Sequence, residues 1–281
     1  MTGKWGVVLL LLLTSGIASA QGVGEVRKQA ESSLLITGEV EIDQAGHLSH
    51  MTIDQREALP PGVVKLVETA SSSWAFKPVV VDGRAMRAKG PMTLRVVARM
   101  LGEDRYQVQI RGATFGSDEA KPDEVVTSVK MGPPKYPEVA FRLGVVGTVY
   151  LLVRVGRDGK VEDVMAEQTN LGVVAREREM NAFRGMLERA SIASARKWMF
   201  ALPKSGPEAN EEHWVVRVPV DYRIGVAKSK YGTWESYIPG PRAIVPWADR
   251  GQMLAGADAM SDGSLYQLGT GLQLLTPLGP G

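Results

Sequence analysis

Three histidines are the imidazole groups of this sequence, and they are the first candidates for metal binding or acid–base catalysis. His47 and His50 have the spacing His-x-x-His, which can bind a metal ion when a helix or a tight loop brings both rings together. On a strand, residues three positions apart face opposite sides of the sheet, so two exposed turn residues are the simpler interpretation. His213 follows two glutamates before an expected edge strand, and a solvated loop explains it equally well. We therefore predict no metal site.

Other patterns that could carry chemistry are incomplete. The serines at 71–73 lack a Gly-x-Ser-x-Gly elbow. Asp158, Glu162 and Asp163 resemble part of a calcium loop, but the twelve-residue pattern with its terminal glutamate is missing. With no cysteine there is neither a disulfide nor a thiolate nucleophile. We therefore predict that the protein is not an enzyme and that it needs no cofactor.

The composition is that of a globular protein without a nucleic-acid-binding surface. Hydrophobic residues make up 44% of the 281 residues, which is enough to build two small domains. The 33 basic residues are nearly balanced by 31 acidic ones, and no basic run stands out. Because nucleic-acid binding needs a concentrated basic surface, we expect no such partner.

The first twenty residues are typical of a secretory signal peptide. Lys4 precedes a short apolar run over residues 7–13, and the small-residue motif Ala18-Ser19-Ala20 precedes Gln21. We predict cleavage between Ala20 and Gln21. The alternative is an uncleaved membrane anchor, although the apolar run is shorter than the roughly twenty residues that a span needs.

Two strands, a helix and a third strand are expected between residues 133 and 225. Every second residue over 149–155 is valine or leucine, which is the period of a strand with one face on a core. Asp158-Gly159 is a strong hairpin-turn signal, and apolar residues recur at helical spacing over 177–198. A last strand over 214–222 closes the unit. The fold class is α+β, with a helix packed on a small antiparallel sheet.

The closing strand is a candidate binding site because its proline, Pro219, suits the edge of a sheet. An extended peptide can pair with a free edge through main-chain hydrogen bonds, while alternate side chains fill pockets. The alternative is an edge covered by the chain's own tail or by a second copy of the chain. We expect Val218→Pro to abolish peptide binding and leave the domain folded. The candidate peptide-binding residues are Val215, Val216, Arg217, Val218, Val220, Asp221 and Tyr222.

The order of these features resembles the carboxy-terminal domain of the TonB energy-transducer family. The resemblance spans roughly ninety residues, about one small domain. It implies a two-layer β-β-α-β domain that recognises extended peptides, with the peptide boxes of outer-membrane transporters as the natural class. The residues that carry it are Tyr136, Pro137, Ala140, Gly144, Gly147, Asp158, Gly159, Trp198, Met199, Phe200 and the valines at 216, 218 and 220.

A shorter version of the same plan precedes this domain. Gln44-Ala45-Gly46 would form the hairpin turn, a helix would begin near Pro60, and Trp74-Ala75-Phe76 matches Trp198-Met199-Phe200. We interpret it as a diverged internal repeat. The expected divisions are a signal peptide (1–20), a leader (21–33), the diverged repeat (34–111), a linker (112–132), the TonB-like domain (133–225) and a tail rich in glycine, proline and aromatic residues (226–281).

These observations predict a periplasmic protein that binds extended segments of envelope proteins, such as outer-membrane transporters, by strand addition. The resemblance also implies energy transduction, which in the family uses a membrane helix with a serine and a histidine and a proline-rich spacer. Residues 1–20 contain no histidine. Transduction, contact with the membrane and an inner-membrane location therefore require that the amino-terminal segment stays uncleaved. The second alternative is a structural envelope protein that self-associates as a homodimer.

Overall fold

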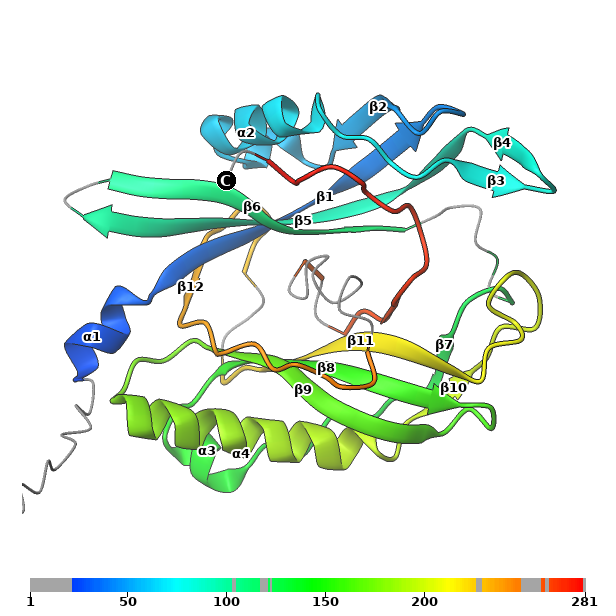
Figure 1. Ribbon diagram of the computed structural model, residues 1–281. Helices are drawn as coiled ribbons and strands as arrows, with labels where there is room; N and C mark the ends of the chain where they lie inside the picture. Colours follow the sequence, from blue (N-terminus) through cyan, green and yellow to red (C-terminus); the bar gives the residue numbers. More distant parts are fainter. Residues whose placement is uncertain are drawn as a thin grey trace, which may run out of the picture.

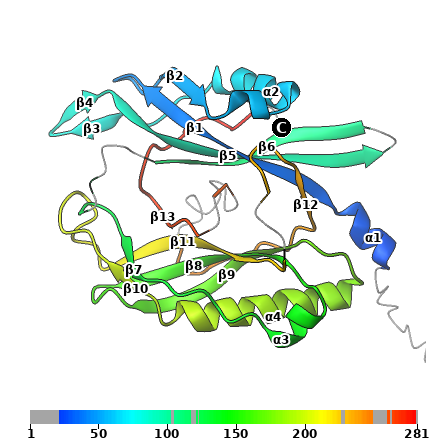
Figure 2. The ribbon, with the colours of Figure 1, turned by 180° about the vertical axis from the view of Figure 1, so that it is seen from behind.

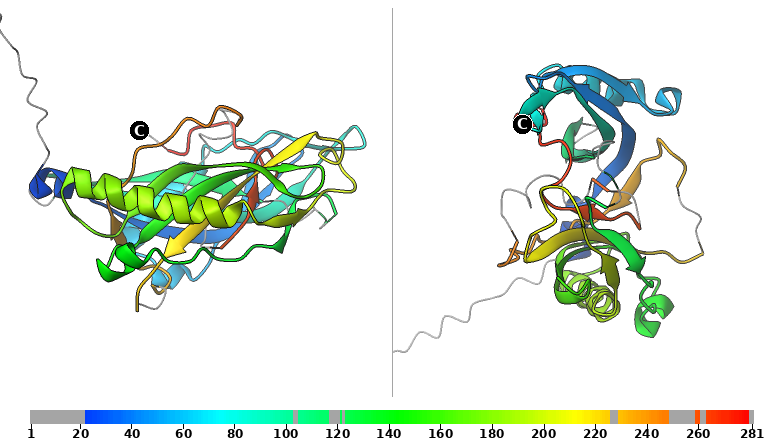
Figure 3. Two further views of the ribbon diagram at one scale, coloured as in Figure 1. Left: turned by 90° about the horizontal axis from the view of Figure 1, so that it is seen from below. Right: turned by 90° about the vertical axis from the view of Figure 1, so that its right-hand side faces the viewer.

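The computed structural model describes residues 22–102, 105–116, 121, 123–225, 229–248, 259–260 and 263–279. The predicted cleavage residues, Ala20 and Gln21, lie outside these ranges. Two antiparallel sheets lie one above the other, with helices on their outer sides and the carboxy-terminal tail running between them (Figures 1 and 3). No helix of the described ranges is long and apolar enough to cross a membrane.

Each sheet belongs to one α+β unit, as the sequence predicted. The first unit consists of α1 (Val23–Lys28), β1 (Glu31–Ile42), β2 (Leu48–Ile53), η1 (Arg56–Ala58), α2 (Pro61–Ser71), β3 (Val79–Val81), β4 (Arg84–Met86), β5 (Ala88–Gly102) and β6 (Arg105–Phe115). The second unit consists of β7 (Thr127–Lys130), α3 (Glu138–Arg142), β8 (Gly147–Gly156), β9 (Val161–Leu171), α4 (Glu177–Ala195), β10 (Met199–Ala201) and β11 (His213–Tyr222). The tail adds β12 (Glu235–Tyr237) and β13 (Tyr266–Gln267).

The strand orders of the two sheets correspond. In the first, β2, β1, β5 and β6 lie side by side, and β12 also pairs with β1. In the second, the order is β9, β8, β11 and β13. Hence β8, β9, α4 and β11 occupy the places that β1, β2, α2 and β5 occupy in the first unit.

The same glycine–phenylalanine contact closes both units. The backbone N–H of Phe76 donates to the carbonyl of Gly46 (2.7 Å), and that of Phe200 donates to the carbonyl of Gly159 (2.8 Å). Both glycines have positive φ, 86° and 73°, which suits a residue without Cβ. A Cβ on Gly46 would lie 2.0 Å from the Phe76 carbonyl oxygen, and one on Gly159 would lie 2.4 Å from that of Phe200. Only glycine therefore fits each hairpin turn.

The core of the second unit forms between β8, β11 and α4. Val149, Val153 and Leu151 are fully buried, as the alternating pattern predicted, and they share a cluster with Met180 and Leu187 of α4. Burying each such side chain contributes about 1.5–3 kcal/mol. The helix begins where the Glu179 carboxylate accepts the Arg176 N–H (3.0 Å), and it ends at Ala195, three residues before the predicted end.

The predicted linker (112–132) is partly ordered into strands. It contains the end of β6, and β7 within it pairs with β10. The segment is rich in turn-forming residues, so its composition did not predict these strands. They are stabilised by backbone pairing with segments that are distant in the sequence. Between β7 and β6, Val126 is buried in the core of the second unit.

The tail holds the two units together. β12 pairs with β1, and Ile238 then forms a β-bridge with Leu171 at the end of β9. Val245 packs against Leu152 on the inner face of the second sheet, and Leu274 returns to the first unit to pair with Phe76. The tail therefore contacts both sheets in alternation.

Candidate functional site

β11 contains the predicted peptide-binding residues and lies between β8 and β13 (Figure 2). Its side chains alternate between two buried faces. Val216, Val218, Val220 and Tyr222 lie in the core with α4, exposed by 7% or less. These four residues support the fold of the domain and do not offer their side chains to a partner.

On the opposite face, Arg217 is fully buried in an ion pair. Its Nε and Nη2 donate to the two carboxylate oxygens of Glu167 on β9, at 2.8 and 3.1 Å. Arg242 of the tail approaches the same carboxylate at 3.4 Å. Val215 packs near Trp247 of the tail. Arg217, one of the predicted peptide-binding residues, is thus covered by the tail.

Asp221 and Tyr222 lie at the end of the strand. The Asp221 carboxylate accepts a hydrogen bond from the Thr148 hydroxyl (2.9 Å) and forms an ion pair with Arg223. The Tyr222 hydroxyl lies 2.8 Å from that of Ser191 and donates to the Leu187 carbonyl (3.1 Å). Burial raises the pKa of Tyr222.

The outer backbone edge of β11 is half covered. The Leu268 N–H donates to the Val215 carbonyl (2.9 Å), and Arg217 pairs with Tyr266. Backbone direction alternates along an antiparallel strand, so Pro219 and Asp221 also direct their backbone groups to this edge. No strand of the described ranges pairs with them there. This half, here called the open half because no described strand pairs with it, has two carbonyls and the Asp221 N–H, since proline has no N–H; Pro219 itself is buried and Asp221 is half-buried.

The same alternation corrects the expected effect of Val218→Pro. The backbone groups of Val218 face β8, and its side chain is 1% exposed in the core. Proline there would break the sheet interior and would not test the edge. Asp221 is the appropriate position, because its N–H faces the open edge.

Several of the residues that carry the family resemblance lie in or beside the core of the second unit, whereas Gly144, Asp158 and Met199 are exposed. The ring of Tyr136 packs edge-on against Tyr222, with centroids 5.1 Å apart, and its hydroxyl donates to the Val145 carbonyl. Trp198 Nε1 donates to the Gly132 carbonyl (2.8 Å). Pro137 immediately precedes α3, Ala140 and Phe200 are buried, and a Cβ on Gly147 would meet the Asn170 carbonyl oxygen. They shape the domain that holds β11.

The histidines do not converge. His47 lies in a turn beside the Asp43 carboxylate (3.3 Å), and the backbone hydrogen bond from His47 is the main cause that lowers the pKa of Asp43. His50 pairs with Glu41 in the first sheet, and His213 begins β11 in the second. Within the described ranges, no three side chains of the metal-binding types lie close together.

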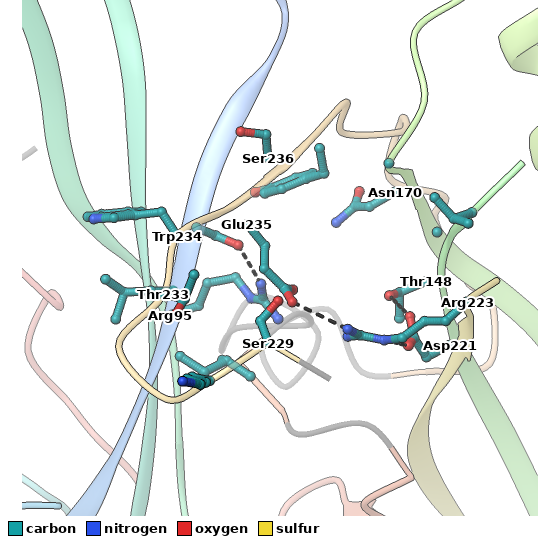
Figure 4. Close-up of a pocket in the computed structure, with 18 of the residues that line it drawn as sticks. Arg95, Thr148, Asn170, Asp221, Arg223, Ser229, Thr233, Trp234, Glu235 and Ser236 are labelled. Carbon is teal, nitrogen blue, oxygen red and sulfur yellow. Dashed lines mark hydrogen bonds and ion pairs between the residues drawn. The ribbon is translucent and has the colours of Figure 1, made fainter. Parts of the chain in front are cut away.

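A cavity of about 530 Å³ separates the two sheets near the open end of β11 (Figure 4). Asp221 and Tyr222 line it from the second sheet, Arg95 from the first, and Trp234 and Glu235 from the tail. Arg223 approaches the Glu235 carboxylate (3.4 Å) across it. No sequence pattern indicated this cavity, because its walls come from segments far apart in the chain.

Comparison with known proteins complements this geometry. No family model matches the sequence. "Protein TonB" from two strains of Xanthomonas campestris pv. campestris is 39% identical over 100 residues, which are 35% of this chain and 38% of the relative. "Protein tonB2" from Pseudomonas aeruginosa is 30% identical over 91 residues, 32% of this chain and 28% of the relative. The chain contains a TonB C-terminal-like domain.

The TonB-like domain accounts for part of the chain, which spans 38% of the length of the Xanthomonas relatives. A solution structure of the Pseudomonas aeruginosa TonB carboxy-terminal domain is 20% identical and has a TM-score of 0.27; it covers 39% of this chain and 95% of that domain.

Proposed function

We propose that this is a non-enzymatic periplasmic protein whose TonB-like domain binds an extended segment of an envelope protein by adding a strand to β11. The observation that carries the proposal is the open half of the β11 edge at Pro219 and Asp221. An outer-membrane transporter is the partner class that the TonB-like relatives suggest.

The geometry supports a short added strand. A peptide antiparallel to β11 would lie in line with β13 and accept the Asp221 N–H while donating to the carbonyls of Pro219 and Asp221, with which no described strand pairs. The adjoining cavity leaves room for its side chains, since Asp221 and Tyr222 line it. Arg223 and Glu235 offer opposite charges there and can discriminate among peptides.

Asp221→Pro tests the proposal, with Asp221→Ala as the matched control. Both variants lose the carboxylate that contacts Thr148 and Arg223, and only proline removes the N–H on the edge. With synthetic peptides from the periplasmic segments of the host's transporters, we expect titration calorimetry to give an affinity at least about tenfold lower for Asp221→Pro than for Asp221→Ala. Equal affinities for two variants with native circular dichroism would refute strand addition at this edge.

We also propose that the first unit is a diverged copy of the TonB-like domain. The shared strand order and the paired Gly46–Phe76 and Gly159–Phe200 contacts support this. In the first unit, β6 lies where β13 lies in the second. β5, which corresponds to β11, is therefore covered by β6 along most of its length. Peptide binding is accordingly assigned to the second unit.

A second candidate function is self-association through β6. This edge strand pairs only with β5 among the described strands, and it exposes Tyr106 and Val108 (57% and 38%). Exposed apolar edges favour pairing with another copy. Analytical ultracentrifugation would show a mass that doubles with concentration, and Val108→Lys would abolish the increase. A constant monomer mass would exclude this candidate.

A further inference from the structure

A short segment of the tail occupies the strand-addition edge. Residues 266–268, here called the latch, run antiparallel to β11, with Gln267 opposite Val216 and Tyr266 opposite Arg217. The Leu268 N–H donates to the Val215 carbonyl at 2.9 Å. The latch thus makes the contacts that an added peptide strand would make.

The latch is a much shorter cover than its counterpart in the first unit. There β6, eleven residues long, pairs with β5 from Met92 to Gly102. β13 has two residues, and beyond Arg217 no strand of the described ranges pairs with this edge of β11. Since each backbone pair adds to the stability of a ladder, β6 is a permanent part of its sheet, whereas β13 is held by few bonds.

The latch also leaves a buried donor unsatisfied. The Gln267 side chain is 4% exposed, and its Oε1 accepts the Val126 N–H at 2.7 Å. Its Nε2 has no hydrogen-bond partner within the described ranges. A buried polar group without a partner weakens the contact that buries it. Leu268 compensates in part, because it packs in an apolar cluster with Leu152 and Val245.

We propose that the latch is an autoinhibitory pseudo-ligand, which an incoming extended segment must displace from β11. This inference rests on the proposed function. The partner pairs first with the backbone groups of Pro219 and Asp221, with which no described strand pairs, and then replaces residues 266–268 along the same line. The contacts of the latch define the chemistry of the partner. An apolar side chain of the partner takes the place of Leu268, and one of its carbonyl oxygens accepts the hydrogen bond from the Val126 N–H.

A reversible crosslink tests whether the latch must leave. Val216 and Gln267 are directly opposed, in a non-hydrogen-bonded pair whose Cα separation of about 4.5 Å suits a disulfide. Because the chain has no cysteine, V216C/Q267C introduces the only thiols. The probe is a fluorescent synthetic peptide with the sequence of residues 263–272, and fluorescence anisotropy measures its binding. We expect the reduced protein to bind it and the oxidised protein to bind at least about tenfold more weakly.

A second variant opens the latch without a crosslink. Leu268→Pro removes the N–H that reaches Val215, and Leu275→Asp is the control, since Leu275 belongs to the tail and its side chain is 65% exposed. We expect Leu268→Pro to bind the probe at least about tenfold more tightly than the wild type, with Leu275→Asp unchanged. Equal probe affinities for the wild type, folded Leu268→Pro and both redox states of the crosslinked protein would overturn the inference.

The proposed function is tested separately with the transporter peptides. If the opened variant binds the 263–272 probe but no transporter peptide, the latch is established and the proposed partner is wrong. If the transporter peptides bind equally to the oxidised and reduced crosslinked protein, strand addition at the open half stands and the latch inference fails.

Discussion

Arg217 Nε on β11 lies 2.8 Å from Glu167 Oε2 on β9, and neither side chain is exposed to solvent. The two strands are not neighbours, because β8 lies between them, so the ion pair spans β8 on the inner face of the sheet. Arg242 of the tail completes the cluster from above. The tail therefore adds a second arginine to this buried pair.

Glu167→Ala should destabilise the protein strongly. It would leave the Arg217 guanidinium buried without its carboxylate, which typically costs about 3–5 kcal/mol. The double variant E167L/R217M, which removes both charges, should lose less stability than Glu167→Ala. Urea denaturation measures the stability of both variants. An unchanged midpoint for Glu167→Ala would show that this ion pair does not stabilise the fold.

The two hairpin glycines should respond alike to alanine. Gly46→Ala would force a Cβ against the carbonyl oxygen of Phe76, and Gly159→Ala would force one against that of Phe200. Gly144 is the matched control: its φ is also positive (68°), but nothing lies within 4 Å of a Cβ there. Gly144→Ala should cost about 1–2 kcal/mol, and the other two distinctly more. Similar thermal midpoints for all three would argue against the shared contact.

Alkaline pH should destabilise the protein through its buried tyrosines. Burial raises the pKa values of Tyr136, Tyr222 and Tyr266. Above about pH 10, the unfolded chain releases phenolic protons that the folded chain retains. The unfolded state then holds fewer protons, so stability present below this pH is lost as the pH rises through the folded pKa values. Thermal melts from about pH 8 to 11 should show the loss, and a smaller one for Tyr222→Phe.

The predicted signal peptide over residues 1–20 leads us to expect a periplasmic location. We expect intact-mass analysis of protein from fractionated host cells to find a soluble species that begins at Gln21. A membrane-bound species that still carries Met1 would instead favour an uncleaved anchor and a role in energy transduction.

Local sequence patterns determined the elements of each unit. Alternating valines predicted β8 and β11, Asp158-Gly159 predicted the turn between β8 and β9, and helical spacing predicted α4. These signals work because strand and helix periods and glycine's access to positive φ are properties of short segments. The resemblance to TonB rested on such segments as well.

The tertiary structure decided what covers each surface. No local pattern marks the two tail residues that pair with β11, or the placement of Arg217 and Glu167 on the same inner face of the sheet, fifty residues apart in the chain. The cavity likewise depends on how the tail separates the two sheets. Such contacts join segments whose own sequences are compatible with solvent exposure, and only the packing of the whole chain selects among their partners.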